Sequence, residues 1–196
     1  AAMAFHLPNA AHSRFVSTQG FYLQAPWQPA ATLPAPAALQ TGDAWSLGQP
    51  GANPDRLKYW APPYFAGEES GLLAPVAAPA YDSDRFVGVV AIDMSLDYLN
   101  RINGGFAYPL GMVSLVDAEG RGRAHPRLYR DPLAVRTPPR FEQFIPREVL
   151  GSHAALTGLP PGEATALEGW HIIRRPLVAA PWQVVYAVPA ADLWGK

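Results

Sequence analysis

Residues 53–99 read NPDRLKYWAPPYFAGEESGLLAPVAAPAYDSDRFVGVVAIDMSLDYL and form the most strongly patterned part of the chain. Aromatic residues and prolines at 59–65 precede two apolar runs, 72–80 and 85–94. Apolar runs of this length that are bounded by turn residues predict two β-strands joined as a hairpin. A single carboxylate, Asp93, lies near the end of the second strand. Few polar groups among aromatic and apolar side chains are typical of a pocket for a small ligand.

The sequence on either side of this stretch predicts short strands and loops, because 22 prolines and 17 glycines are too many for a helical bundle. Residues 28–54 predict a long loop with one short strand near Trp45. A loop of that length inside a compact domain is more often functional than idle. Further strands are predicted at 14–17, 21–24, 111–116, 163–167, 170–177 and 183–188, and the turn residues 117–120 predict a hairpin whose return strand leads into 124–126.

Two segments of the chain are similar to each other. Residues 89–97 align with residues 184–192, and each segment is a final sheet strand that passes into a helix. With a break at Gly104 and Gly105, this repeat predicts an α+β chain of two tandem units, each an antiparallel sheet flanked by helices. In this alignment Asp93 corresponds to Val188. Because a buried carboxylate is costly without a partner, we expect the ligand site in the first unit.

The composition excludes several classes of function. With 15 Lys and Arg, 16 Asp and Glu and a net charge of -1, nothing draws the chain to nucleic acid. The absence of cysteine excludes disulfides, thiolate catalysis and cysteine zinc sites. The five histidines lack the spacing of metal ligands, so no metal and no cofactor is predicted. No run approaches the roughly 20 apolar residues of a membrane-spanning helix.

Three groups of residues match the motifs of one protein family. They are Trp60, Pro62, Pro63 and Tyr64, then Pro79, Tyr81 and Asp82, and then Phe86, Gly88, Val89, Val90 and Asp93. The chain thereby resembles the extracytoplasmic Cache sensor domains of bacterial transmembrane receptors. The resemblance implies a double Cache domain of two PAS-like units, with a membrane-distal, ligand-binding unit at 1–104 and a membrane-proximal unit at 105–196. Such domains usually begin with a long helix, and we expect it to be missing from this chain.

The candidate ligand-binding residues are Trp27, Arg56, Tyr59, Trp60, Tyr64 and Asp93. Asp93 could accept hydrogen bonds from a ligand ammonium group, and some Cache domains use an Asp at this place. Arg56 has a planar fork suited to a carboxylate or a phosphate. The four aromatic residues could wall the pocket. The resemblance also includes the stretch 17–22 that leads to Pro26 and Trp27, which implies that Trp27 borders the same cavity.

Each of these candidates also has a purely structural interpretation. Asp93 could pair with Arg56 or Arg85, or bond to the backbone at the end of its strand. Arg56 could be a surface residue, and the aromatic residues could be ordinary packing of a loop over a sheet. The chain also departs from the amino-acid-binding members of the family, because Arg56 is followed by Leu57, Lys58 and Tyr59 and the Tyr-x-Asp motif is missing after Tyr64. This departure argues against a free α-amino acid and favours another amine, an organic acid or a nucleobase, although an amino acid stays among the predicted ligand classes.

The resemblance implies a periplasmic sensor that is part of an inner-membrane protein and possesses no catalysis of its own. Its output module, outside this chain, would be a diguanylate cyclase, a histidine kinase or a chemoreceptor, reached through flanking membrane helices, and the receptor could form a homodimer. Two alternatives remain open. The chain could be a ligand-free dimerisation or protein-partner module in which Arg56 and Asp93 pair with each other. It could also be a hydrolase, which requires a Ser–His–acid cluster in one cleft.

Overall fold

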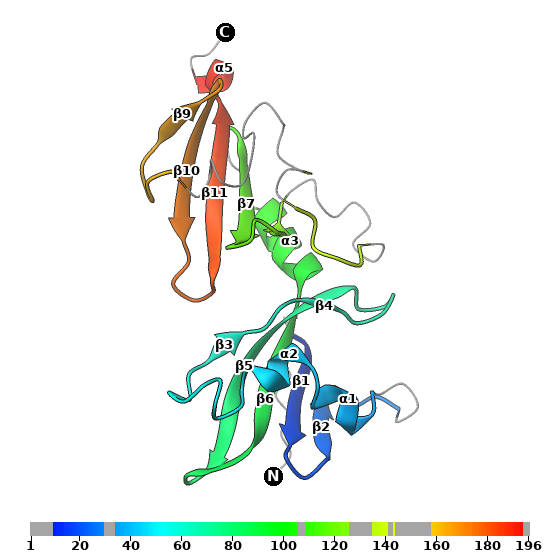
Figure 1. Ribbon diagram of the computed structural model, residues 1–196. Coiled ribbons are helices and arrows are strands. Elements are labelled where there is room, and N and C mark those ends of the chain that lie inside the picture. Colours follow the sequence, from blue (N-terminus) through cyan, green and yellow to red (C-terminus); the bar gives the residue numbers. More distant parts are fainter. Residues whose placement is uncertain are drawn as a thin grey trace. The chain divides into compact units, whose positions relative to one another are not determined.

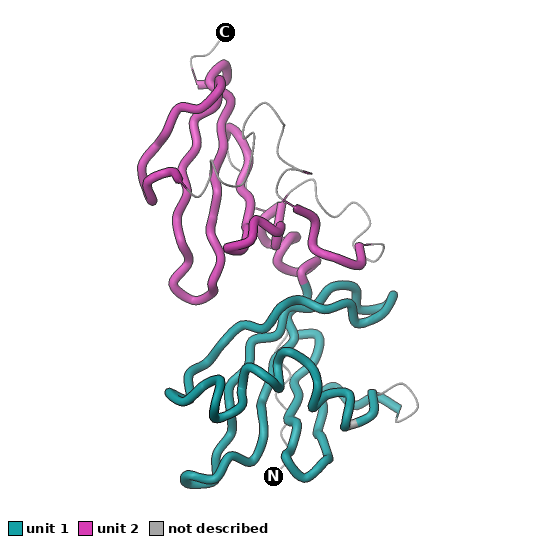
Figure 2. Tube along the Cα trace, viewed as in Figure 1, with its two compact units in different colours: residues 1–95 teal, residues 96–196 magenta. Residues whose placement is uncertain are grey.

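The chain folds into two compact units, Ala1–Ser95 and Leu96–Lys196 (Figure 2). The computed structural model describes residues 10–29, 34–105, 109–125, 135–140, 143 and 158–193. The first unit is built on one antiparallel sheet and the second unit on another (Figure 1). The predicted α+β class, with two tandem units of sheet and helix, is therefore confirmed.

The sheet of the first unit contains the predicted hairpin at its centre. Its strands are β1 (Ala10–Ser17), β2 (Tyr22–Ala25), β3 (Tyr59–Trp60), β4 (Tyr64–Phe65), β5 (Leu72–Asp82) and β6 (Arg85–Ser95). Across the sheet the order is β2-β1-β6-β5-β3, and β4 also pairs with β5. The short strands β3 and β4 follow the same edge of β5, because two prolines, Pro62 and Pro63, separate them and cannot donate to a ladder.

One face of this sheet carries the core of the first unit. Ala77, Val89 and Ala91 are buried on it, and Trp45, Tyr59 and Phe86 pack against them. Side chains alternate between the two faces of a strand, so the residues between these core positions point the other way. Val90, Ile92 and Met94 accordingly lie on the opposite face and are only half-buried.

Two short helices, α1 (Pro36–Leu39) and α2 (Asp43–Ser46), lie in the segment that the sequence predicts as a long loop (Figure 1). The short strand predicted near Trp45 is wrong, because Trp45 belongs to α2. The amides of Trp45 and Ser46 both donate to the carbonyl of Gly42 at 3.0 Å, which closes a helical turn. Asp43 in the first turn favours this helix by its interaction with the positive end of the helix dipole.

Among the residues that the structure describes, the sheet of the second unit has five strands, and each overlaps a strand predicted from the sequence. They are β7 (Met112–Asp117), β8 (Gly122–Ala124), β9 (Thr165–Leu167), β10 (Trp170–Pro176) and β11 (Trp182–Pro189), in the order β8-β7-β11-β10-β9. A short helix, α5 (Ala190–Leu193), follows the last strand. The buried core of the second unit is formed by Val116, Ile172, Val185 and Ala187.

Helix α3 (Leu96–Gly105) belongs to the second unit, whereas the sequence predicts the division between the units at residue 104. Asn103 donates a hydrogen bond of 2.8 Å to the carbonyl of Val113, and the side-chain oxygen of Asn100 accepts one of 2.8 Å from the amide of His125. Both partners belong to the second unit. These buried bonds attach the helix to the sheet that follows it in the sequence.

The two units share one topology. When the strands of each unit are numbered along the chain, the order across each sheet is second, first, fifth, fourth, third, with β3 and β4 together in the third place of the first unit. In each unit the fifth strand passes directly into a helix. The internal repeat predicted from the sequence is therefore present in the fold.

The repeat is offset by one residue from the alignment predicted from the sequence. Counting back three residues from the helix that follows each final strand pairs Asp93 with Ala187 rather than with Val188. Ala187 shares the core face with Val185, whereas Val188 points to the other face, because a shift of one residue reverses every side chain of a strand. The difference between the units remains: a carboxylate in the first is matched by an apolar residue in the second.

Candidate functional site

Four polar side chains meet on the core face of the first sheet. His12 and Arg14 lie two residues apart on β1, and Asp93 lies directly opposite His12 on β6. Residues two apart on one strand, and residues opposite each other on paired strands, share a face. Tyr64 of β4 reaches the same point from the far edge of β5, where Pro75 is the residue opposite Asp93.

Asp93 is the centre of this cluster and its side chain is fully buried. Its Oδ1 accepts a hydrogen bond from Arg14 Nη2 at 2.8 Å, and its Oδ2 accepts one from the Tyr64 hydroxyl at 3.1 Å. His12 Nδ1 lies 3.9 Å from Oδ2. The guanidinium of Arg14 also lies 5.5 Å from the centre of the Tyr64 ring, so the cation contacts both the carboxylate and an aromatic face.

Burial controls the ionisation of this cluster. It raises the pKa of Asp93 above its ordinary value, and the Arg14 charge, the Tyr64 hydrogen bond and His12 oppose that shift. Burial also lowers the pKa of His12, against the attraction of Asp93. The pKa of Tyr64 is raised, chiefly by burial and then by the Asp93 charge. The hydroxyl therefore stays protonated and donates its hydrogen bond to Asp93. Burial therefore works against the charged forms of Asp93, His12 and Tyr64, while Arg14 attracts the Asp93 charge.

A cavity of about 280 Å³ lies between this face of the sheet and the segment that contains α1 and α2. Arg14 and Tyr64 line it, together with Asp43 from α2. Most of the remaining lining is apolar and includes Val16, Leu39, Trp45, Pro75, Val89 and Ala91. An apolar cavity with a few convergent polar groups is the usual form of a small-molecule site.

Helix α2, which covers the cavity, is held in place by Tyr59 and Trp45. The Tyr59 hydroxyl donates a hydrogen bond to the carbonyl of Ala44, and burial raises the pKa of Tyr59 to about 12. The ring of Trp45 packs on Phe86 with 5.7 Å between the ring centres. Tyr59 therefore supports the cover of the cavity and is not part of its lining.

Replacing Tyr59 by phenylalanine should loosen α2 and lower the free energy of unfolding by about 1 kcal/mol, because the Ala44 carbonyl loses its donor. Hydrogen exchange at the amides of Trp45 and Ser46 should become faster, and urea unfolding should measure the stability loss. Tyr22 provides a matched control, since its hydroxyl is buried without a hydrogen-bond partner among the described residues. Tyr22→Phe should leave stability unchanged or slightly higher, and an equal loss from both variants would contradict this role of Tyr59.

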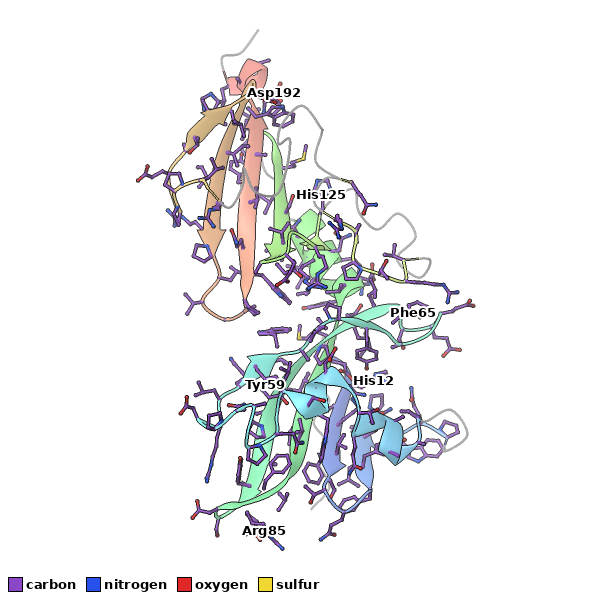
Figure 3. All side chains as sticks on the ribbon, viewed as in Figure 1. His12, Tyr59, Phe65, Arg85, His125 and Asp192 are labelled. Atoms are coloured by element: carbon purple, nitrogen blue, oxygen red, sulfur yellow. The ribbon has the colours of Figure 1, made fainter. Side chains whose placement is uncertain are left out.

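The remaining predicted site residues lie away from the lining. Arg56 pairs with the exposed Asp84 at 3.0 Å and stacks on Tyr81, with its guanidinium 4.1 Å from the ring centre. The cation that pairs with Asp93 is therefore Arg14. It is neither Arg56 nor Arg85, the two partners that the structural interpretation of Asp93 offered. Figure 3 shows Arg85 at the tip of the β5–β6 hairpin, far along the sheet from His12.

Trp27 and Trp60 also differ from the expected pocket wall. Trp27 follows the edge strand β2 and is 81% exposed. Trp60 is half-buried on β3, next to Tyr59 and therefore on the alternate face of the strand. Of the six predicted residues, Tyr64 lines the cavity and Asp93 lies directly behind it, in contact with its hydroxyl.

Arg14 was not among the residues predicted from the sequence, and His12 was considered only as one of five scattered histidines. The available signal was the alternation His12, Arg14, Val16 on a strand that leads into a turn, which puts two cationic side chains on one face. That signal was weak, because Phe15 and Val16 are both apolar and leave the buried face of the strand undecided.

The second unit has no equivalent of this cluster at the matching positions. Met112, Ser114 and Ala187 occupy the places of His12, Arg14 and Asp93. A wider hollow of about 750 Å³ lies near Arg121 and Arg140, but Arg121 is already paired with Asp117 and Glu119 at 2.9 Å. We therefore place the candidate site in the first unit.

In the part of the chain that the structure describes, no three His, Asp or Glu side chains come together as metal ligands. Among its helices, none has the length and apolar character needed to span a bilayer.

Solved structures share this fold over nearly the whole chain. The ligand-binding domain of the Pseudomonas aeruginosa amino acid chemoreceptor PctC, in complex with GABA, is 17% identical, with a TM-score of 0.65 over 92% of this chain and 75% of its own. That of Pseudomonas fluorescens CtaA with L-alanine is 16% identical, with a TM-score of 0.63 over 96% and 76%. That of Pseudomonas aeruginosa PctB with L-Gln is 19% identical, with a TM-score of 0.62 over 96% and 72%.

These likenesses show the fold. The chain shares its fold of two tandem α+β units with these chemoreceptor ligand-binding domains, which is the fold that the resemblance to Cache domains implies. No family model matches the sequence, and neither does any curated protein.

Proposed function

We propose that this chain is the extracytoplasmic ligand-sensing domain of a bacterial transmembrane signalling protein and binds a small polar molecule in its first unit. The observation that carries the proposal is the cavity of about 280 Å³, whose base presents Arg14 and Tyr64 in contact with the buried Asp93. Arg14, Tyr64 and Asp93 form the polar part of the proposed site. The shared fold with chemoreceptor ligand-binding domains supports the sensing role.

The arrangement of elements around the cavity suits a sensor. The cover is formed by α1 and α2, two helices of four residues each in a long connection, and the base is formed by strands. A ligand that contacts both would favour the conformation in which the cover is closed, which is the condition for a signal. Because β6 continues directly into α3, a change at Asp93 has a covalent path of a few residues to the second unit.

The parent protein is proposed to carry this domain on the periplasmic side of the inner membrane, as a homodimer, with a cytoplasmic output module. A diguanylate cyclase, a histidine kinase and a chemotaxis signalling module remain the predicted outputs. The sensing proposal itself depends on the cavity alone and can be tested with the isolated chain.

The two alternatives have less support. A partner-binding module in which Arg56 neutralises Asp93 does not agree with the observed pairs, because Arg56 bonds to Asp84 and Asp93 bonds to Arg14. A hydrolase needs a serine and a histidine in its cleft. Among the described residues that line the cavity there is neither.

A thermal-shift screen against amines, amino acids, organic acids and nucleobases should find a compound that stabilises the chain. At 100 times its dissociation constant, such a ligand adds about 2.7 kcal/mol to the free energy of unfolding. Ala91→Leu should abolish the shift, because Ala91 lines the cavity and the larger side chain fills it. The exposed Ala118 of the second unit gives the matched control Ala118→Leu, which should keep the full shift. A ligand that stabilises both variants equally would show that the cavity is not the site.

A further inference from the structure

The hollow of the second unit is lined mainly by cations. Its volume is about 750 Å³, and it lies between the turn that joins β7 to β8 and the later segment 135–140. Three arginines line it, Arg121 from the turn and Arg136 and Arg140 from the segment. Among the described residues of its lining, the only carboxylate is Glu119. A hollow with an excess of one sign of charge concentrates ions of the opposite sign.

Backbone bonds hold the two sides of the hollow together. The amide of Gly122 donates a hydrogen bond of 2.7 Å to the carbonyl of Pro139, and Arg121 forms an antiparallel bridge with Arg140. Pro138 and Pro139 further restrict the backbone of the later segment. Residues that pair across such a bridge share a face. The side chains of Arg121 and Arg140 therefore start from neighbouring positions beside the hollow.

Arg121 is oriented by two carboxylates of unequal burial. Its Nε donates a hydrogen bond to Oδ2 of Asp117 at 2.9 Å, and its Nη2 donates one to Glu119 at 2.9 Å. The Asp117 side chain is buried, whereas that of Glu119 is 63% exposed. Asp117 therefore fixes the direction of the guanidinium. The exposed pair with Glu119 contributes little, so an anion can take the place of Glu119 at low cost.

The charge of Arg140 is not compensated within the described part of the chain. The amide of Arg140 donates a hydrogen bond of 2.7 Å to Gln143 Oε1, but the described residues give its guanidinium no ion pair. Like charges that line one hollow also repel each other. An anion bound between the arginines would relieve this repulsion and supply the missing acceptor.

We propose that the hollow of the second unit binds a small multivalent anion, a molecule with two or more carboxylate or phosphate groups. Guanidinium groups bind both kinds of group through paired hydrogen bonds. The distribution of three arginines around one hollow favours more than one anionic group on the ligand. This site goes beyond the sensing function proposed above, because it lies in the other unit and shares no lining residue with the first cavity.

Isothermal titration of the 196-residue chain with citrate, succinate and acetate tests the valence of the ligand. These compounds carry three, two and one carboxylates, so the affinity should fall in that order and acetate should show no binding. Pyrophosphate, titrated in parallel, distinguishes a phosphate ligand from a carboxylate ligand. Raising the NaCl concentration from about 50 mM to about 500 mM should weaken binding several-fold, because salt screens exposed charges.

A pair of matched variants tests the location of the site. Arg140→Gln should weaken binding of the tighter of citrate and pyrophosphate about tenfold, because the ligand loses a charge-assisted hydrogen bond. Arg101→Gln makes the same change of charge on α3, where Arg101 pairs with Asp97 at 3.2 Å outside the hollow, and should leave the affinity unchanged. Equal losses from the two variants would show an effect of net charge alone and overturn the site.

A third variant changes the affinity in the opposite direction. Glu119→Gln should strengthen binding of the anion, because it removes the carboxylate that competes for Arg121. All three substitutions change exposed or half-exposed side chains, and thermal unfolding of each variant checks that it is folded. If Glu119→Gln left the affinity unchanged while Arg140→Gln reduced it, Arg121 would not contact the ligand and the arrangement proposed here would be wrong.

The outcomes separate this inference from the sensing function. Ala91→Leu fills the cavity of the first unit and should leave the binding of multivalent anions intact. Anion binding that is lost in Ala91→Leu belongs to the first cavity and overturns the site in the second unit. If neither citrate nor pyrophosphate binds to the wild type, this inference is overturned and the proposal for the first unit is unaffected.

Discussion

Asp93→Ala should lower the free energy of unfolding by about 3–5 kcal/mol, the cost of breaking a buried ion pair from one side. The truncation leaves two buried donors, Arg14 Nη2 and the Tyr64 hydroxyl, without their acceptor. It also opens a void where a fully buried side chain was packed. Urea unfolding followed by circular dichroism measures the loss.

Asp93→Asn should cost far less than Asp93→Ala. The Asn amide keeps an oxygen that can accept a hydrogen bond from Arg14. The pKa of Asp93 is raised, because burial disfavours its charged form in spite of the nearby Arg14. The folded state therefore holds the Asp93 proton to higher pH than the unfolded state does. The stabilisation that this bound proton provides is fully present below the pKa of Asp93 in the unfolded state. It is lost as the pH rises through the pKa of Asp93 in the folded state. The stability of the wild type relative to Asp93→Asn should accordingly fall as the pH rises.

An exposed ion pair provides the control for these variants. Asp84 is 96% exposed and pairs with Arg56 at 3.0 Å, so Asp84→Ala should change stability by no more than about 1 kcal/mol. If Asp93→Ala cost as little as Asp84→Ala, the cluster would not be the organising feature of the site. If Asp93→Asn were as damaging as Asp93→Ala, the charge and not the hydrogen bonds would be the stabilising element.

The fold could be predicted from the sequence wherever a signal was local. The hairpin of β5 and β6 follows from two apolar runs around a polar turn, and the second hairpin follows from the turn residues between β7 and β8. Such patterns depend on residues close together in the chain. The α2 helix was missed, since four residues around Trp45 carry no periodicity from which a helix could be recognised.

The candidate site depended on pairings that no local pattern contains. Arg14 and Asp93 are separated by 79 residues, and the register of β1 against β6 alone brings them together. Register also explains why Val188 was taken as the counterpart of Asp93, since a shift of one residue changes the face. Tyr64 was identified because its motif and Asp93 belong to the same stretch of sequence.

Gly88→Ala should be as damaging as Asp93→Ala, although Gly88 has no side chain to lose. A Cβ at this position would lie 2.1 Å from the carbonyl oxygen of Val16 and 2.8 Å from the ring of Phe15. The backbone of Gly88 has φ +156°, a conformation that residues with a side chain rarely adopt. Overpacking of about 1–3 kcal/mol and backbone strain of about 1–3 kcal/mol together predict a loss of about 2–6 kcal/mol, a range centred on the loss expected for Asp93→Ala.

Two other glycines separate these contributions. Gly51 has open space around its Cβ position and an ordinary φ, so Gly51→Ala should leave stability unchanged or slightly raised. Gly67 has φ +100° with no atom within 4 Å of the added Cβ, so Gly67→Ala should show backbone strain alone. The order of urea midpoints should be Gly51→Ala, then Gly67→Ala, then Gly88→Ala. If Gly88→Ala matched Gly67→Ala, β1 could move away from β6 at no cost. In that case the register that holds Arg14 against Asp93 would not be rigid, and ligand binding would have to supply the order that we assign to the sheet.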